Sequence, residues 1–324
     1  MKLDLFQWAG LKATQAGAPC LAPAGNLACG NSPMSLMRYL AVSDDYLKFF
    51  SEKNILITGG SSGIGFAIAS FINGIAKNII IISDNSDRLK EAESKLISKN
   101  AHSNILSLKC DIGDWIQVKF MADKVIADVG CPHVVINNAG FAYYHTFDQM
   151  TEVEVEETAN VNFIGFLRVT RVFVPHLIKS KSHVCIVNIA SVAGAFPITP
   201  NSVYGGAKAG MLAFSELLEI ELRPFGVNVL SVCPGRVITP FFDHDSYKTR
   251  DAGSETSLVV PIENVVGGIL KAVALGKKIV FIPAYWRFFS WWISFDRMIS
   301  RPLYKLFLCR RVKKLRKQKG NNSL

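Results

Sequence analysis

Hydrophobic and polar positions between residues 54 and 282 alternate between two periods. Short apolar runs rich in Ile and Val alternate with stretches whose apolar residues recur three or four positions apart. Such runs are typical of strands buried on both faces, and the longer period is typical of amphipathic helices. The predicted strands are Asn54–Thr58, Asn78–Ser83, Asn104–Lys109, His133–Asn137, His183–Ala190, Val227–Cys233 and Lys278–Ile282.

Helical periodicity is clearest at Leu89–Leu96, Phe120–Val129 and Leu212–Leu222. Strands that alternate with helices predict right-handed crossovers and a parallel sheet. The fold class is therefore α/β, with a single doubly wound parallel sheet, helices on both faces and a C-terminal amphipathic basic extension. No internal repeat is apparent, and one domain accounts for residues 51–283.

The first 50 residues differ from this domain. They contain Ala, Gly, Pro and Cys without periodicity. Asp4 and the lack of a clean apolar run argue against a signal peptide. We expect residues 1–50 to be a flexible extension and assign them no chemistry.

The C-terminal segment 284–324 is aromatic and basic. The run Ile279–Phe295 has 17 residues but is interrupted by Pro283 and Arg287, so it is too short and broken for a spanning helix. From Trp286 onward, apolar residues recur at helical spacing with Lys and Arg between them, which suits a helix lying in a bilayer interface. This predicts peripheral or monotopic contact with the cytoplasmic side of a membrane. The alternative is a helix packed on the protein's own core or on a second copy, followed by a solvated tail.

Charge is concentrated in the same segment. The formal net charge is +10, and residues 285–324 hold 11 Lys or Arg and one acid, so the rest of the chain is balanced. A basic surface spread over the fold, as expected of a nucleic-acid binder, is absent.

Cysteine and histidine spacing does not predict a metal site. The seven cysteines form no C-x-x-C pair, and no two of the six histidines are four residues apart. We interpret the cysteines as buried free thiols in a reducing compartment and expect no bound metal.

A glycine-rich turn joins the first predicted strand to a helix that begins near Phe66. Its sequence is Thr58-Gly59-Gly60-Ser61-Ser62-Gly63-Ile64-Gly65. Glycines allow a tight turn and close approach to a pyrophosphate at the helix N-terminus. The spacing differs from the common G-x-G-x-x-G fingerprint, so a plain strand-to-helix connection is the alternative.

Asp84 strengthens the dinucleotide interpretation. It ends the second strand 19 residues after Gly65, near the offset of an acid that binds the adenosine ribose. A carboxylate there would repel a 2′-phosphate, and the nearest cation is Arg88 in the next helix. The prediction is NAD(H), with NADP(H) not excluded. Alternatively, Asp84 only caps that helix.

Three further motifs follow later strands: Asn137-Asn138-Ala139-Gly140, Ser191, and Tyr204-Gly205-Gly206-Ala207-Lys208. Together with the glycine turn, and in this order, they resemble the short-chain dehydrogenase/reductase family over about residues 51–283. The resemblance implies a Rossmann fold and hydride transfer between a nicotinamide cofactor and a substrate carbon.

Tyr204 and Lys208 carry the predicted chemistry. They are four residues apart on a helix, so their side chains share one face. A free phenol has a pKa of about 10, and a neighbouring ammonium is expected to lower it toward the range useful for proton transfer. Ser191 can donate a hydrogen bond to the substrate oxygen and stabilise its developing charge.

The resemblance implies further roles. Lys208 also binds the nicotinamide ribose, and Asn162 holds a water in a proton relay, with Asn160 as a nearby alternative. Pro234, Gly235 and Thr239 position the nicotinamide carboxamide, and Asp111 with Ile112 contacts the adenine. The other expected cofactor contacts are Thr58, Gly59, Ser61, Gly63, Ile64, Gly65, Asn138, Ala139 and Gly140.

The predicted function is NAD(H)-dependent interconversion of an alcohol and a ketone or aldehyde on an apolar, lipid-like or steroid-like substrate. The expected substrate walls are Ile238–Pro261, with Phe241, Phe242, Tyr247 and Leu258, and Val192–Asn201, with Phe196 and Ile198. The alternatives are an NADP(H)-dependent carbonyl reductase and a non-catalytic cofactor-sensing or membrane-scaffold protein. The family resemblance also implies a homodimer or homotetramer.

Overall fold

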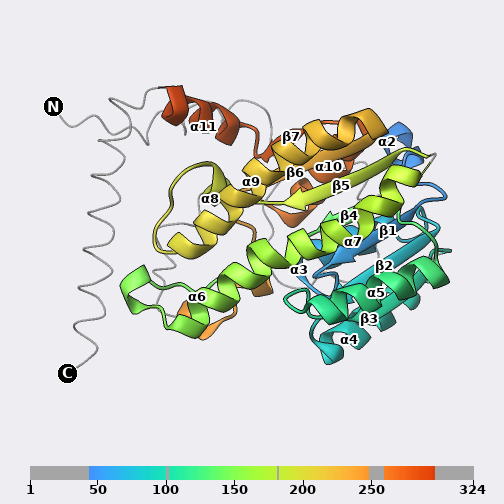
Figure 1. The fold of residues 1–324 in the computed structure, drawn as a ribbon, viewed down its shortest axis with the longest axis horizontal. Coiled ribbons are helices and arrows are strands. Elements are labelled where there is room, and N and C mark those ends of the chain that lie inside the picture. Colours follow the sequence, from blue (N-terminus) through green and yellow to red (C-terminus); the bar gives the residue numbers. More distant parts are fainter. Residues whose placement is uncertain (1–43, 100–101, 181, 248–258, 296–324) are drawn as a thin grey trace, which may run out of the picture.

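The computed structural model describes residues 44–99, 102–180, 182–247 and 259–295. Its centre is a seven-stranded parallel sheet in the order β3-β2-β1-β4-β5-β6-β7 (Figure 1). The prediction of a doubly wound sheet is confirmed, and the first three strands have the predicted bounds. The strands are β1 (Asn54–Thr58), β2 (Asn78–Ser83), β3 (Asn104–Lys109), β4 (Val134–Asn137), β5 (Val184–Ile189), β6 (Val227–Pro234) and β7 (Ile279–Ile282).

Helices connect these strands and cover both faces of the sheet (Figure 1). Several start at a capping side chain, for example Asn85 before α4 and Asp114 before α5, because these side chains accept hydrogen bonds from the first free amides. The helices are α2 (Asp44–Lys48), α3 (Gly63–Ile72), α4 (Ser86–Ile97), α5 (Trp115–Asp128), α6 (Glu152–Ala159), α7 (Phe166–Lys179), α8 (Val192–Ala195), α9 (Ser202–Leu222), α10 (Ile262–Ala274) and α11 (Tyr285–Phe295). A π-helical turn, η2 (Asn160–Gly165), joins α6 to α7, and the short 3-10 helices are Phe147–Gln149, Arg223–Phe225, Pro240–Phe242 and Asp245–Tyr247.

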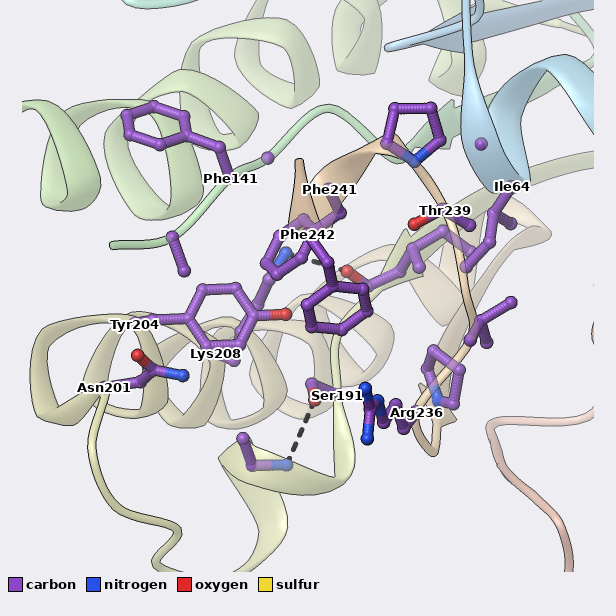
Figure 2. Close-up of a pocket in the computed structure, with 18 of the residues that line it drawn as sticks. Ile64, Phe141, Ser191, Asn201, Tyr204, Lys208, Arg236, Thr239, Phe241 and Phe242 are labelled. Atoms are coloured by element: carbon purple, nitrogen blue, oxygen red, sulfur yellow. Dashed lines mark hydrogen bonds between the residues drawn. The ribbon is translucent and has the colours of Figure 1, made fainter. Parts of the chain in front are cut away.

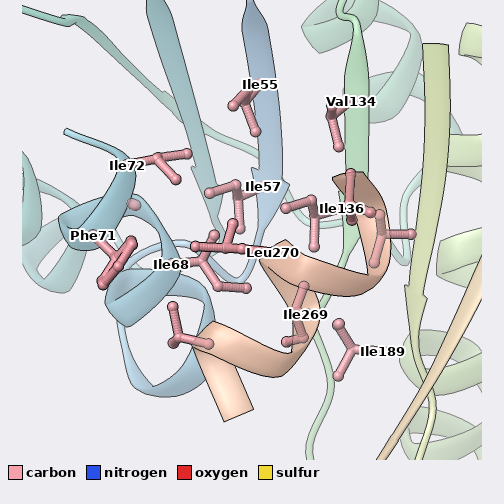
Figure 3. Packing of buried hydrophobic residues seen from close by; sticks show 14 of the residues in the cluster. Ile55, Ile57, Ile68, Phe71, Ile72, Val134, Ile136, Ile189, Ile269 and Leu270 are labelled. Carbon is pink, nitrogen blue, oxygen red and sulfur yellow. The ribbon is translucent and has the colours of Figure 1, made fainter. Parts of the chain in front are cut away.

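Alternate strand residues supply the two cores. On one face, Ile55 and Ile57 of β1 pack with Ile68 and Ile72 of α3 and with Leu270 of α10 (Figure 3). The neighbouring residue Leu56 points to the other face, against residues of α5, α7 and α9. Burial of both faces explains why the strands are almost continuously apolar.

The domain begins earlier than predicted. Leu47 and Phe50 precede the expected boundary at residue 51, yet both are buried in the core cluster that contains α3 and α10. The remainder of the expected extension, residues 1–43, lies outside the described residues, as do residues 296–324 of the expected C-terminal segment.

Within the described residues, the helical stretch Glu152–Lys179 is long and apolar enough to cross a membrane by length and composition alone. It consists of α6, η2 and α7. Phe166, Val169, Phe173 and Leu177 are buried on its inner side. This burial is what a core helix of the doubly wound fold requires.

Candidate active site

Two adjoining cavities, of about 550 and 280 Å³, lie at the carboxyl ends of the strands. The chain adds strands on one side of β1 up to β3 and then on the other side from β4 onward, so the topological switch point lies between β1 and β4. Ligands of doubly wound sheets bind at this point. The two cavities share lining residues from the glycine turn and from the loop after β4, including Gly59, Ala139 and Gly140. They therefore form the two halves of one cleft.

The glycine turn is shaped by close backbone contacts. Gly59 and Gly63 have φ angles of +63° and +53°, which side chains disfavour. A Cβ on Gly65 would lie 2.4 Å from the carbonyl oxygen of Gly59. Ser62, before α3, makes no side-chain capping bond, so the first amides of α3 have no side-chain acceptor there. This arrangement fits a pyrophosphate.

Thr58 and Asn138 hold this turn against the loop after β4. The Asn138 Nδ2 donates to the carbonyl oxygens of Thr58 and Gly59 at 3.0 and 3.1 Å. The Thr58 hydroxyl accepts from the backbone amides of Asn138 and Ala139 at 3.0 and 3.1 Å. Thr58 and Gly65 were predicted to contact the cofactor, but they line neither cavity. Both residues support the turn from behind.

The smaller cavity contains most of the residues predicted for the adenosine end. Ser61, Asp84, Asp111 and Ile112 line it. Asn85, not Asp84, caps α4, because its Oδ1 accepts from the amides of Asp87 and Arg88. The alternative role of Asp84 as the helix cap is therefore wrong. Arg88, in the first turn of α4, borders both cavities.

The loop after β3 is held by contacts that sequence patterns did not indicate. An Arg168 Nη1 donates to the carbonyl oxygen of Gly113 at 2.6 Å and to the Asn160 Oδ1 at 2.7 Å. The Asn160 Nδ2 donates to the same carbonyl at 3.2 Å. Asn160 thus supports the loop that carries Asp111 and does not face the larger cavity.

Asn162 occupies a different environment in the same π-helical turn. Its Nδ2 donates to the carbonyl oxygens of Phe141 and Thr158 at 2.7 and 2.9 Å. Its Oδ1 is buried without a hydrogen-bond partner among the described residues. A Cβ on Gly140 would lie 2.6 Å from this oxygen and 3.5 Å from the Lys208 Nζ, so Asn162 and Lys208 approach the same glycine.

Ser191, Tyr204 and Lys208 are brought together in the larger cavity (Figure 2). Ser191 follows β5 and caps the short helix α8, accepting from the amide of Ala193 at 3.1 Å. Tyr204 and Lys208 lie in the first two turns of α9, with the Lys208 Nζ 5.7 Å from the centre of the Tyr204 ring. That ammonium donates to the carbonyl oxygen of Ile189 at 2.9 Å.

Burial shifts the pKa values of both α9 side chains. It raises the pKa of Tyr204 to about 12, while a hydrogen bond with Ser191 acts in the opposite direction. Burial lowers the pKa of Lys208 to about 8. The expectation that Lys208 lowers the pKa of Tyr204 is wrong for the protein alone, because desolvation of the phenolate is the dominant influence.

The predicted nicotinamide and substrate walls meet at the same cavity. Pro234, the last residue of β6, and Gly235 and Thr239, which follow the strand, line it. Among the substrate candidates, Ile198, Phe241, Phe242 and Tyr247 line it, whereas Leu258 lies outside the described residues. Phe196 instead stacks on Trp286 of α11 at 5.1 Å between ring centres, so its position as a cavity wall was predicted wrongly.

Other residues near the site were not predicted. Tyr144 and Arg236 line the larger cavity, together with Asn201, the last residue of the predicted wall 192–201. Buried Asn137 donates to the Asn188 Oδ1 at 2.8 Å. Asn137 belongs to the quoted N-N-A-G motif, but its partner on β5 could be identified only from strand pairing. No cluster of three or more His, Cys, Asp or Glu suited to a metal occurs within the described residues.

Comparisons with known proteins agree with this geometry. A family profile described as short chain dehydrogenase matches residues 53–249. An uncharacterized oxidoreductase of Staphylococcus epidermidis is 34% identical over 200 residues, covering 61% of this chain and 84% of that protein. Human 17-beta-hydroxysteroid dehydrogenase type 2 is 29% identical over 209 residues, covering 63% of this chain and 52% of that protein.

Solved structures show the same fold. A short-chain dehydrogenase/reductase from Burkholderia phymatum in complex with NAD has a TM-score of 0.66 at 23% identity, covering 74% of this chain and 92% of that one. A short-chain dehydrogenase from Sphingobium yanoikuyae in complex with NADPH has a TM-score of 0.63 at 24% identity, covering 81% and 95%. With the profile match over more than half of its length, the chain belongs to the short-chain dehydrogenase/reductase family of oxidoreductases.

Proposed function

We propose that the chain interconverts an apolar secondary alcohol and its ketone with a nicotinamide dinucleotide, NAD(H) being preferred. The observation that carries the proposal is the convergence of Ser191, Tyr204 and Lys208 on a cavity continuous with the glycine turn. A scaffold or cofactor sensor has no need of a proton-transfer set in this position. The cleft fits the cofactor because its glycines leave no room for side chains and the α3 amides are not capped by Ser62.

The cofactor, when bound, supplies the hydride donor or acceptor. The protein handles the proton. Tyr204, with a pKa of about 12, is protonated at neutral pH and can donate to a ketone oxygen. Ser191 can donate to the same oxygen and stabilise its negative charge. Lys208, with a pKa of about 8, can exchange protons near neutral pH, and Asn162 has an unpartnered buried oxygen beside it, suited to hold a relay water.

Cofactor preference follows from Asp84. Its carboxylate lines the adenosine end and has no capping role, so it is available to accept from ribose hydroxyls and would repel a 2′-phosphate. Arg88 at the border of both cavities supports the alternative, an NADP(H)-dependent reductase. The solved structures include one with NAD and one with NADPH, which leaves both candidates.

An apolar substrate is supported by the cavity wall. Ile198, Phe241, Phe242 and Tyr247 surround the space beside Tyr204, and Phe241 contacts the Tyr204 ring at 5.6 Å between centres. Two relatives are described as steroid dehydrogenases or as similar to them: the human protein above and an Arabidopsis 11-beta-hydroxysteroid dehydrogenase-like protein, 27% identical over 253 residues. Steroid-like or lipid-like alcohols are therefore the first class to test.

We also propose peripheral membrane contact through the C-terminal segment, on the cytoplasmic side. Trp286 and Phe289 attach α11 to Phe196, whereas Tyr285, Phe288 and Trp291 are exposed. Exposed aromatic rings beside a basic segment suit an anionic bilayer surface. The double variant Phe288→Ser/Trp291→Ser should reduce cosedimentation with anionic vesicles, and unchanged cosedimentation would contradict this assignment.

A homodimer or homotetramer, as the family resemblance implies, is a separate proposal that sizing of the full chain would test.

The catalytic proposal is tested by turnover of secondary alcohols with NAD⁺ and NADP⁺. Tyr204→Phe should lower kcat by about a thousandfold because it removes the proton-transfer group while keeping the ring. Tyr46→Phe in the distant helix α2 is the matched control and should retain activity. Equal activity of Tyr204→Phe and wild type would refute the assigned mechanism.

A further inference from the structure

Asn201 occupies the capping position of α9 but does not cap it. The side chain makes no capping hydrogen bond, in contrast to Asn85, which accepts from two amides at the start of α4. Asparagine is favoured at this position because its side-chain oxygen can accept from the first helical amides. The Asn201 amide is therefore available for another interaction.

The backbone and the side-chain oxygen of Asn201 are both unusual. Its φ of +105° lies in a region that L-residues rarely adopt, and strained residues of this kind cluster at functional sites. Its Oδ1 is buried and has no hydrogen-bond partner among the described residues, and the same holds for the Oγ1 of Thr199, two residues earlier. A buried polar atom without a partner destabilises the fold, so two on one short segment point to a ligand.

Both residues line the larger cavity. Figure 2 shows Asn201 near Tyr204, which follows it by three residues. The neighbouring wall is mostly apolar, with Ile198 from the same segment and Phe241 and Phe242 from the loop after β6. Polar groups placed in an otherwise apolar pocket fix the orientation and identity of a ligand.

We propose that Thr199 and Asn201 form a polar subsite for a second functional group of the substrate, in the same cavity as Tyr204. Because the Asn201 Oδ1 is an acceptor, that group must be a hydrogen-bond donor, either a hydroxyl or an amide N–H. The inference rests on the proposed function and narrows it to apolar secondary alcohols that carry a second hydroxyl or an amide, and to the corresponding ketones.

The redox step is unchanged by this subsite. In ketone reduction the C=O π bond breaks as hydride from NAD(P)H forms the carbinol C–H bond, and the Tyr204 hydroxyl gives its proton to the oxygen. Alcohol oxidation is the reverse and requires that Tyr204 has first lost its proton. The second functional group keeps its proton and donates a hydrogen bond to the Asn201 Oδ1. The subsite therefore orients the substrate without joining the chemistry.

The test compares 2-octanol, using full-length enzyme, with bifunctional probes that carry a hydroxyl or an acetamido group at one of carbons 3 to 6. We expect the wild type to favour at least one of these bifunctional probes over 2-octanol by about tenfold in kcat/KM, the size of one buried hydrogen bond. Which probe is favoured distinguishes a hydroxyl from an amide. Glycine tolerates the positive φ but has no side-chain amide. In Asn201→Gly the ratio of kcat/KM for the favoured bifunctional probe to that for 2-octanol should therefore fall to about one. Asn201→Asp retains a hydrogen-bond acceptor and should retain the preference for the bifunctional probe.

Binding keeps the test independent of turnover. Dissociation constants of the same alcohols, measured by calorimetry in the presence of NADH, which cannot oxidise them, should give the same ratio and the same response to Asn201→Gly. Equal ratios in wild type and Asn201→Gly, by turnover or by binding, would overturn the subsite. If the wild type binds the probes with the expected ratio but oxidises none of them with either cofactor, the subsite stands and the proposed function fails.

Discussion

The adenosine end and the substrate end of the cleft differ in what shapes them. At the adenosine end the backbone is decisive: Gly59 and Gly63 have positive φ, and Gly65 lies against the carbonyl of Gly59. At the substrate end, side chains from separate segments form the wall, such as Ile198 before α9 and Phe241 after β6. Backbone geometry accepts few substitutions, whereas a wall of side chains can be altered without losing the fold. The two tasks proposed for the cleft, holding a dinucleotide and selecting a substrate, thus fall on different parts of it.

The largest effect is expected at the adenosine end. Gly65→Ala would place a Cβ 2.4 Å from the Gly59 oxygen and 2.6 Å from the Asn138 Nδ2, so the turn must move. We expect cofactor affinity to fall by at least about a hundredfold and the free energy of unfolding by about 1–3 kcal/mol. Gly206→Ala, where an added Cβ meets nothing within 4 Å, is the control for both titrations. Wild-type cofactor affinity in Gly65→Ala would contradict the close-packed turn.

At the catalytic end, Ser191→Ala should lower kcat by about a hundredfold, because one donor to the substrate oxygen is lost. Cofactor affinity should change little, since the adenosine end is untouched. The variant also loses the bond to the Ala193 amide, so unfolding curves must accompany the kinetics. Ser202→Ala, on the exposed start of α9, should keep both properties. A loss confined to stability, with normal kcat, would make Ser191 structural only.

A smaller change is expected for cofactor choice. Asp84→Asn removes the charge that would repel a 2′-phosphate and should shift the ratio of NADH to NADPH dissociation constants about tenfold toward NADPH. Asp87→Asn, an exposed acid in the first turn of α4, is the matched control. An unchanged ratio would show that Asp84 does not select the cofactor and would favour Arg88 as the determinant.

The smallest effect concerns stability and pH. Burial lowers the pKa of Lys208 from 10.5 to about 8, so between these pH values the unfolded chain holds a proton that the folded chain has lost. Below pH 8 the buried amine is charged, and its burial lowers the free energy of unfolding by the full amount. This loss of stability diminishes as the pH rises from 8 toward 10.5. Lys208→Met should gain stability over wild type at pH 7, and the gain should shrink by about 1–2 kcal/mol at pH 9.5. Denaturant titrations at the two pH values measure the difference in free energy of unfolding between Lys208→Met and wild type. A difference that does not change with pH would contradict the lowered pKa of Lys208.

The sequence allowed much of the fold and half of the site to be predicted, because both depend on local patterns. Ile-rich runs identify β1 and β2, and the spacing of Tyr204 and Lys208 places both on one helix face. What it could not show depends on contacts between distant segments. Arg168 reaches Gly113 across 55 positions, and Phe196 turns to Trp286 of α11 and away from the cavity. The pKa of Tyr204 also depends on three-dimensional burial, which spacing on a helix does not report.

The central claim is that one nicotinamide dinucleotide spans both halves of the cleft, beside Tyr204. Titration of the full-length protein with NADH, followed by energy transfer from tryptophan to the nicotinamide, tests it most directly. The account predicts saturable binding of one NADH per chain, displacement by ADP-ribose, and the same affinity in Tyr204→Phe within about twofold. No saturable binding of NADH or NADPH would contradict it.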